Sequence, residues 1–304
     1  MQAMTNVTKD GEALDVPLKI TYITTVIFNS ITCPFTVVLN VLVIMAVKRR
    51  QRLQSYANIL LACLAITDTF TGLLVQPTFI IWRIFQLLRG INTDIVHPLY
   101  SQSLTIVTFS SALHLMLVTC ERLIAIKYTM AYPYLVTTQK IKVAVTTSWL
   151  VALFCSIIRW PLSDLLFNKG VAEKIGKMIV STIMISCIVF MATSYAILYK
   201  ETVHQQNKIK TQQLPQEEVE RFVKERKVLK TTVYVVGAVL FCLSPGAVPF
   251  LAVITEQNST YISPWFRTMI MSNSLLNPLI YCWRQKEMRL IVFRISSPAI
   301  AVVN

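Results

Sequence analysis

The sequence has little charge. Only 14% of its 304 residues are charged, whereas 54% are hydrophobic and the mean hydropathy is +0.57. Soluble domains carry about 25% charged residues, so this composition excludes an ordinary soluble protein. It indicates instead a protein that lies in the lipid bilayer.

Several other features are scarce or absent. No cysteine falls in a predicted outer loop, so we expect no extracellular disulfide and a packing role for the thiols. All seven lie in hydrophobic segments: Cys33, Cys63, Cys120, Cys155, Cys187, Cys242 and Cys282. The three histidines are scattered and no nucleophile motif is present, so we expect that the protein is not an enzyme. No internal repeat is visible, which counts against a transporter built from duplicated halves.

The sequence does contain long hydrophobic segments with little or no charge. Four of them carry no Asp, Glu, Lys or Arg, and they cover residues 20–47, 95–120, 178–199 and 231–255. Three more carry at most one charged residue, and they cover residues 53–82, 143–160 and 264–283. A membrane helix needs about 20 apolar residues. The pattern predicts an all-α membrane protein, a seven-transmembrane helix bundle.

The remaining residues predict how the chain is divided. After Trp283 the sequence RQKEMRLIVFRI is basic on one face and apolar on the other, which predicts an amphipathic helix eight on the membrane surface. We therefore expect an extracellular tail at residues 1–18 and a seven-transmembrane domain at 19–283. Helix eight and a short cytoplasmic tail would then occupy residues 284–304.

Basic residues predict the orientation. If the N-terminus is outside, the inner loops and tail hold 20 of the 29 Lys and Arg, and the outer side holds 9. Excess Lys and Arg in short loops keeps those loops in the cytoplasm, so we expect the N-terminus outside and the C-terminus inside. The net charge of +14 then reflects contact with the inner leaflet and not with nucleic acid. The sequons at Asn6 and Asn258 would face outside as candidate glycosylation sites.

Polar side chains recur at mid-depth in the hydrophobic segments. They are Asn40, Asp68, Ser111, Asn273, Ser274 and Asn277. A carboxylate in the bilayer is costly unless it is paired, and no Lys or Arg shares the predicted depth of Asp68. Its partner is then a small hard cation such as Na⁺ with water, or else the carboxyl group is protonated. A neutral polar network that joins the helices is the alternative interpretation.

Helical spacing predicts which residues face a shared interior. The third segment has such a face at Leu104, Thr108, Ser111, Leu115, Val118 and Arg122, and the seventh has one at Arg267, Met271, Ser274, Pro278 and Tyr281. The sixth has one that runs from Glu225 through Gly246 to Phe250. At the inner end Arg122 is placed to bond Glu121 and to reach Glu225, a partly exposed contact of about 1 kcal/mol. Ordinary pairing with lipid headgroups is the alternative for this arginine.

Together these residues resemble the fingerprint of rhodopsin-like (class A) G-protein-coupled receptors. The matching positions are Asn40, Asp68 at the end of LACLAITD, Glu121-Arg122, Trp149, Tyr195, the sequence FCLSP ending at Pro245, and NPLIY at residues 277–281. The motifs follow the order of the family, each on its own segment. The resemblance implies a plasma-membrane receptor whose partners are a small-molecule or peptide ligand, the lipid bilayer and a heterotrimeric G protein.

The resemblance also implies a role for each residue. Asn40, Asp68, Ser111, Asn273, Ser274 and Asn277 would form a sodium pocket, while Glu121, Arg122, Tyr195, Glu225, Pro245, Pro278 and Tyr281 would form the activation switch. Arg122 and Met130 would contact the G protein once the sixth helix moves outward at its inner end.

The chain departs from the family pattern at several positions. The third-helix position of the outer disulfide of the family holds His97, a difference shared with melanocortin and cannabinoid receptors. The spacing after Tyr281 resembles that of adenosine and melanocortin receptors. Leu243 and Leu123 replace a conserved Trp and Tyr of the family motifs, which leaves a constitutively active or decoy protein as an alternative.

The resemblance implies a ligand pocket in the outer half of the bundle. Its residues would be Leu104, Thr108, Gly246, Phe250, Arg267 and Met271. Leu104 stands where amine receptors carry Asp, and Met271 stands where pigments carry the retinal-binding Lys, so we expect no retinal. We hypothesise that Arg267 binds an anionic or strongly polar ligand group. An arginine that extends to the membrane surface or pairs with Glu256 is the alternative.

Overall fold

The computed structural model describes residues 15–88, 93–128, 131–165, 169–211 and 261–284, with short stretches between 216 and 241 and at 289–290. These residues form helices and no strand. The elements are α1 (Val16–Arg49), η1 (Gln51–Leu53), α2 (Tyr56–Phe70), η2 (Thr71–Val75), α3 (Gln76–Leu88), α4 (Val96–Lys127), α5 (Tyr132–Leu135), α6 (Thr138–Leu165), α7 (Lys169–Thr211) and α10 (Ser263–Arg284). The predicted all-α architecture is confirmed.

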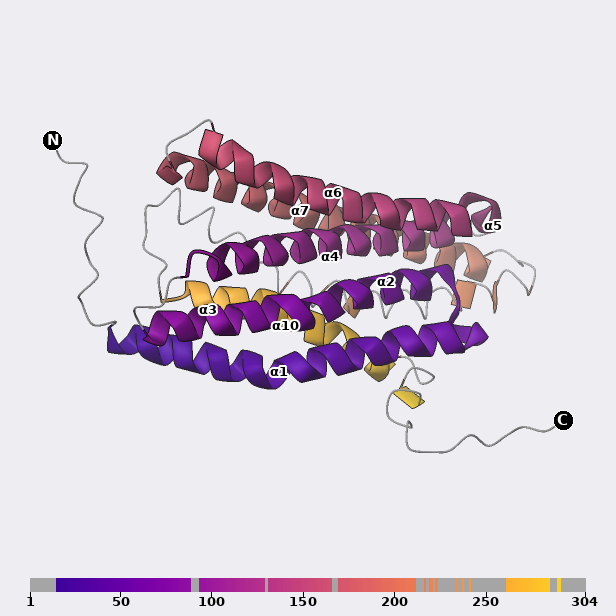
Figure 1. The fold of residues 1–304 in the computed structure, drawn as a ribbon. Helices are drawn as coiled ribbons and strands as arrows, with labels where there is room; N and C mark the ends of the chain where they lie inside the picture. Colours follow the sequence, from indigo (N-terminus) through magenta and orange to yellow (C-terminus); the bar gives the residue numbers. More distant parts are fainter. Residues whose placement is uncertain are drawn as a thin grey trace.

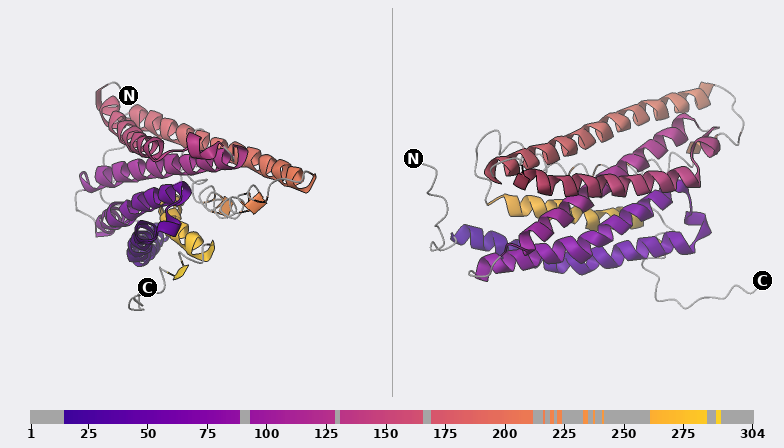
Figure 2. Two further views of the ribbon diagram at one scale, coloured as in Figure 1. Left: turned by 90° about the vertical axis from the view of Figure 1, so that its right-hand side faces the viewer. Right: turned by 45° about the horizontal axis from the view of Figure 1, so that its top comes forward.

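Long helices cover the predicted membrane spans except the sixth. α2, η2 and α3 form one continuous helix, and five helices in the described residues are long and apolar enough to cross a membrane. α10 covers the predicted seventh span, whereas most of the predicted sixth span lies outside the described residues. From α1 to α7, successive long helices run in alternating directions along one axis (Figure 1), and the helices gather into a bundle when viewed from its end (Figure 2).

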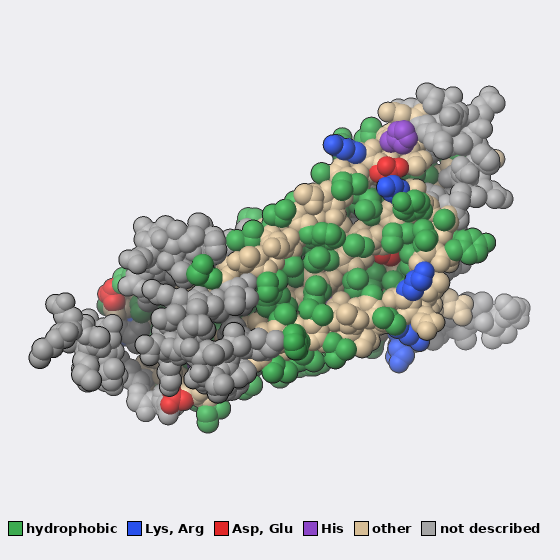
Figure 3. All heavy atoms as spheres, turned by 90° about the horizontal axis from the view of Figure 1, so that it is seen from above, with side chains coloured by type: hydrophobic (Ala, Val, Ile, Leu, Met, Phe, Trp, Pro, Cys, Tyr) green, Lys and Arg blue, Asp and Glu red, His purple; other side chains and the backbone are tan. Residues whose placement is uncertain are grey.

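α4 occupies the middle of the bundle. It packs against α2, α3, α6 and α7, while α1 packs against α2, α3 and α10. The inward face predicted for the third span is confirmed at depth, because Leu115, Val118 and Arg122 are all buried. The outer sides of the helices carry exposed apolar residues such as Phe35, Leu150 and Phe154, and Figure 3 shows this hydrophobic surface along the side of the bundle. An exposed apolar surface of this kind marks contact with a membrane or with another protein, and the length and composition of these helices favour the membrane.

A single π-helical turn interrupts the second span. In η2 the backbone N–H of Gln76 bonds to the carbonyl of Thr71, five residues back. Gly72 lies in this turn, and its carbonyl accepts a hydrogen bond from the thiol of Cys33 on α1 at 3.1 Å. A Cβ atom at Gly72 would stand 2.6 Å from Cγ2 of Val37. The absence of a side chain therefore lets α1 approach this turn closely.

We expect Gly72→Ala to lower the thermal unfolding midpoint of the protein. The added methyl group overpacks the contact with Val37, and overpacking typically costs about 1–3 kcal/mol. Gly237 is the matched control, because a Cβ atom there would meet nothing within 4 Å. Gly237→Ala should be neutral or stabilising, and adding Val37→Ala should rescue Gly72→Ala. A neutral Gly72→Ala would show that α1 can move away without cost.

Candidate functional site

A carboxylate lies at the centre of the bundle. Asp68, near the end of α2, is 0% exposed. Its Oδ2 accepts a hydrogen bond of 2.7 Å from Nδ2 of Asn277 on α10, while its Oδ1 has no partner among the described residues. The structure thus brings together two predicted residues that are 209 positions apart in the chain.

Proline explains how α1 joins this centre. Pro278 has no N–H, so the carbonyl of Ser274, four residues earlier in α10, lacks its usual helical donor. Nδ2 of Asn40 on α1 donates to this carbonyl at 2.8 Å. The hydroxyl of Ser274 donates to Oγ1 of Thr71 in η2 at 3.0 Å. The Asn-Pro pair therefore creates an acceptor that ties α10 to α1, and the serine ties α10 to the second span.

Several oxygens of the residues predicted for the sodium site have no protein partner. They are Oδ1 of Asn40, Asp68, Asn273 and Asn277, and Oγ of Ser111, all buried and unpaired within the part of the chain that the structure describes. Unpaired buried oxygens are rare in folded proteins because their desolvation is not compensated. One carboxylate among neutral oxygens is the donor set that suits a hard monovalent cation or water. The residues present therefore fit the predicted sodium site.

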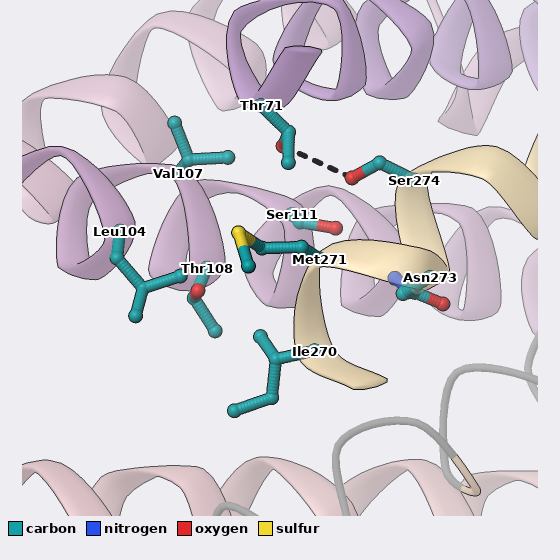
Figure 4. Close-up of a pocket in the computed structure, with 9 residues that line it drawn as sticks. All are labelled: Thr71, Leu104, Val107, Thr108, Ser111, Ile270, Met271, Asn273 and Ser274. Atoms are coloured by element: carbon teal, nitrogen blue, oxygen red, sulfur yellow. Dashed lines mark hydrogen bonds between the residues drawn. The ribbon is translucent and has the colours of Figure 1, made fainter. Parts of the chain in front are cut away.

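A cavity connects this polar centre to the predicted ligand pocket. It is lined by Thr71, Leu104, Val107, Thr108, Ser111, Ile270, Met271, Asn273 and Ser274. Figure 4 shows these side chains, which come from η2, α4 and α10, with Met271 extending toward Thr108. The outer part of the lining is mostly apolar and the inner part is polar. The cavity therefore lies between residues of the polar centre and residues of the predicted ligand pocket.

Arg267 lies at the outer end of the same face of α10. It is half-buried, and its guanidinium carbon lies 5.0 Å from the centroid of the Trp82 ring and 5.7 Å from that of the Tyr100 ring. Such cation–π contacts stabilise an arginine by about 0.5–2 kcal/mol. Arg267 therefore faces aromatic rings of α3 and α4, in agreement with its predicted position on the inward face.

At the opposite end of α4 an ion pair is buried, so the prediction of a partly exposed contact is wrong for the Glu121–Arg122 pair. Arg122, 2% exposed, donates from Nε and Nη2 to the two carboxylate oxygens of Glu121. The hydroxyl of Tyr132, in α5, donates to Oε1 of the same carboxylate. A bidentate arginine–carboxylate pair is among the stronger hydrogen-bonded contacts in proteins. Glu121 therefore fixes the position of the Arg122 guanidinium, and Tyr132 fixes the position of the Glu121 carboxylate.

Two tyrosines of the predicted switch lie in the interior. Tyr281, on α10, is buried in the inner hydrophobic cluster, and Tyr195, on α7, packs against Ile126 and Leu198. The hydroxyls of both tyrosines are buried without a partner among the described residues. Each is therefore a donor that can still form a hydrogen bond in another arrangement of the helices.

Other predicted residues lie outside the described part of the chain. They are Asn6, Met130, Glu225, Pro245, Gly246, Phe250 and Asn258, with the Glu256 alternative for Arg267. The roles assigned to them stay predictions, as do the boundaries drawn at 18 and 283. α1 itself begins at Val16.

A second polar cluster was missed in the sequence. Nδ2 of Asn29 donates to Oγ1 of Thr268 at 3.0 Å, and Nε2 of Gln76 donates to Oγ1 of Thr32 at 3.1 Å. The cluster joins α1, α3 and α10, and on α1 it lies closer to the N-terminal end of the helix than Asn40 does. Its signal was present, because polar residues recur at helical spacing in the first span at positions 25, 29, 32, 36 and 40. Tyr132 was missed as well, and nothing in its sequence context pairs it with Glu121.

The fold and the site define a multi-pass membrane protein with a polar interior. The chain belongs to the rhodopsin family of seven-transmembrane receptors, because the model of that family matches residues 39–281. Membership of this family makes the chain a receptor and not an enzyme, as predicted.

Individual relatives agree with the family. The chain is 26% identical to trace amine-associated receptor 13c of Danio rerio over 311 residues, which cover 88% of this chain and 86% of the relative. It is 26% identical to trace amine-associated receptor 8c of Mus musculus over 83% of this chain and 81% of that one. It is 23% identical to the histamine H2 receptor of Canis lupus familiaris over 84% of this chain and 74% of that one. The likeness to adenosine, melanocortin or cannabinoid receptors stays a prediction.

Proposed function

We propose that this receptor transmits the binding of an extracellular ligand to heterotrimeric G proteins inside the cell. The observation that carries the proposal is the buried Glu121–Arg122 pair at the end of the bundle where α1 carries Lys48 and Arg49. Basic helix ends favour the cytoplasmic side of a membrane. The pair would then face the cell interior of a plasma-membrane receptor, with the N-terminus outside and the C-terminus inside.

The proposed switch works through competition for Arg122. Glu121 holds the guanidinium while Tyr132 holds Glu121. Agonist would favour a second state in which the sixth helix moves outward and the unpaired hydroxyls of Tyr195 and Tyr281 turn toward the inner cleft. Arg122 would then face the α-subunit of the G protein, with Met130 as an apolar contact in the second inner loop.

We also propose a sodium ion at the Asp68 centre. The support is the set of unpaired oxygens of Asp68, Ser111 and Asn273, which come from α2, α4 and α10. When bound, the ion supplies the positive charge that compensates the buried carboxylate. The residues themselves hold the three helices in one arrangement, which would be the inactive one.

The ligand we propose carries negative charge. The relatives found include receptors named for trace amines and histamine. In this chain, however, Leu104 stands where amine receptors carry Asp, and Arg267 lies against the rings of Trp82 and Tyr100, one helical turn outward from the cavity-lining Met271. A protonated amine is repelled by this guanidinium, whereas an anionic or strongly polar group is attracted.

The first experiment measures basal cAMP and calcium in cells that express the receptor, followed by a screen of a ligand library. An agonist that raises nucleotide exchange on a purified G protein supports the proposal. A high signal without any ligand favours a constitutively active receptor, for which Leu123 and Leu243 are the motivating residues. Exchange that no library compound alters, with no basal signal, contradicts coupling to G proteins.

Once an agonist is known, Arg267→Leu should lower its potency about 10- to 100-fold. The substitution keeps the apolar stem but removes a hydrogen-bonding charge worth about 1.5–3 kcal/mol. Lys19→Leu is the matched control, because it removes an exposed positive charge from α1 at the same end of the bundle. Concentration–response curves with equal surface expression decide the outcome. Unchanged potency in Arg267→Leu would make this arginine structural.

A further inference from the structure

A second arginine lies in the aromatic cluster that Arg267 contacts. Arg83, on α3, is 3% exposed. Its guanidinium carbon lies 4.0 Å from the centroid of the Trp82 ring, 4.3 Å from that of Tyr22 and 5.3 Å from that of Phe79. Arginine is almost never this deeply buried unless it is paired. Here the described surroundings are aromatic rings from α1 and α3, which stabilise the cation but supply no charge to neutralise it.

The polar contacts of this arginine are incomplete. Nη1 of Arg83 donates to Oε1 of Gln86 at 2.7 Å, while Nε is buried without a partner among the described residues. The hydroxyl of Tyr100 on α4 is also buried and unpaired within the same set of residues. Buried donors without acceptors are rare because their lost hydration is not compensated. Both donors therefore indicate an acceptor that the described side chains do not provide.

Trp82 brings the two arginines near each other. The guanidinium carbons lie 4.0 Å and 5.0 Å from the centre of its ring, so they are at most 9 Å apart. Neither arginine forms a salt bridge with a carboxylate of the described residues, whereas Arg122 does. Like charges at this spacing repel each other more strongly in a bundle interior than in water. An anion between them would remove this repulsion.

Apolar side chains lie one helical turn further in. Met271 is four residues inward from Arg267 on α10, and Leu104 is four residues inward from Tyr100 on α4. Met271 and Leu104 both line the cavity described above, and both belong to the hydrophobic cluster that contains Trp82. The side chains one turn further in from the arginines are therefore apolar, which favours an apolar body on a ligand whose head lies at the arginines.

We propose that Arg83 and Arg267 form a two-arginine subsite for the head group of an amphipathic organic anion, with its apolar body directed toward Leu104 and Met271. This inference rests on the proposed receptor function and specifies the class of ligand for that same outer site. A guanidinium presents parallel N–H donors that match the two oxygens of a carboxylate, sulfonate or phosphate group. The hydroxyl of Tyr100 adds one more donor. The same pair of charges rejects a protonated amine of equal size.

The test compares three probes that share a six-carbon chain: hexanoate, hexan-1-ol and hexylammonium. The purified full-length receptor is placed in nanodiscs of neutral phosphatidylcholine, and its thermal unfolding midpoint is followed as each probe is added. Hexanoate should raise the midpoint at concentrations where the alcohol and the ammonium do not. An equal shift with hexan-1-ol, or a larger one with hexylammonium, would overturn the assignment.

Variants then separate the two arginines. Arg83→Gln and Arg267→Gln should each raise the hexanoate concentration for a half-maximal shift at least tenfold, while Lys19→Gln should leave it unchanged. Arg83→Lys keeps the charge but loses the paired donors, so its half-maximal hexanoate concentration should lie between those of the wild type and Arg83→Gln. This variant also provides the test if Arg83→Gln does not fold. The two-arginine subsite is refuted if the response to hexanoate depends on Arg267 alone and every Arg83 variant that folds responds like the wild type.

One further arm identifies the source of the anion. If phosphatidylglycerol added to the nanodiscs competes with hexanoate, a lipid headgroup supplies the anion; without competition, a soluble ligand supplies it. Either result is consistent with the two-arginine subsite. Because no G protein is present in these measurements, loss of hexanoate binding leaves the test of G-protein coupling unaffected. Conversely, a failure to couple leaves the binding result intact.

Discussion

Asp68→Asn is expected to abolish the stabilisation of the receptor by sodium. The amide has almost the shape of the carboxylate but carries no charge to attract a cation into the bundle. Asp68 is fully buried and its Oδ1 has no partner among the described residues. A ligand present at 100 times its Kd stabilises a protein by about 2.7 kcal/mol, so the lost effect is large. Thermal unfolding in sodium chloride, compared with equal N-methylglucamine chloride, measures it.

Two neighbouring serines provide matched variants. Ser111→Ala removes one of the unpaired oxygens and should weaken the response to sodium. Ser110→Ala should preserve it, because the Ser110 hydroxyl lies 3.3 Å from Nδ1 of His114 and is not one of the unpaired oxygens around Asp68. A wild-type receptor that is equally stable in both salts would favour the neutral polar network. An Asp68→Asn receptor that still responds to sodium would favour the same interpretation.

The second large effect is expected at the inner end. Arg122→Ala should abolish nucleotide exchange on the G protein, because the guanidinium is the group proposed to contact the α-subunit. Glu121→Gln should instead raise basal exchange, since the amide no longer forms charge-assisted bonds to Arg122. A hydrogen bond to a charged group contributes about 1.5–3 kcal/mol, which corresponds to a 10- to 100-fold shift of the two-state equilibrium.

Smaller changes at the same cluster refine this test. Tyr132→Phe removes one hydrogen bond to Glu121 and should raise basal exchange less than Glu121→Gln does. Lys127→Ala is the control, because this lysine lies at the end of α4, the helix that carries Arg122, and contacts the ring of Tyr128. Exchange that persists in Arg122→Ala at equal expression would show that coupling does not depend on this arginine.

The two centres share α4 and α10. Ser111 and Arg122 lie three helical turns apart on α4, and Asn277 and Tyr281 lie about one turn apart on α10. A rotation of either helix would therefore change the Asp68 centre and the inner cluster together. The polar contacts that join α10 to α1 and the second span would resist this rotation, because Asn40 and Thr71 each bond to Ser274.

The sequence by itself determined the class of protein and much of the interior. Uncharged segments of about 20 residues must form helices in a bilayer, because every backbone polar group has to be satisfied within the segment. Helical spacing then identifies the inward face, and Ser111, Arg122, Met271 and Ser274 are all buried as this spacing predicts. Asp68 and Asn277 were assigned to one site from their motifs, and the hydrogen bond between them agrees.

The tertiary structure alone decided how these faces meet. The bond from Asn40 to the Ser274 carbonyl, the approach of α1 to Gly72 and the bond from Tyr132 to Glu121 join different elements. So does the aromatic cluster that holds Arg83 and Arg267. Periodicity specifies the direction in which a side chain points from its own helix, but not the rotation and offset of the helix that packs against it. Those depend on the fit between two surfaces, which exists only once the helices are packed.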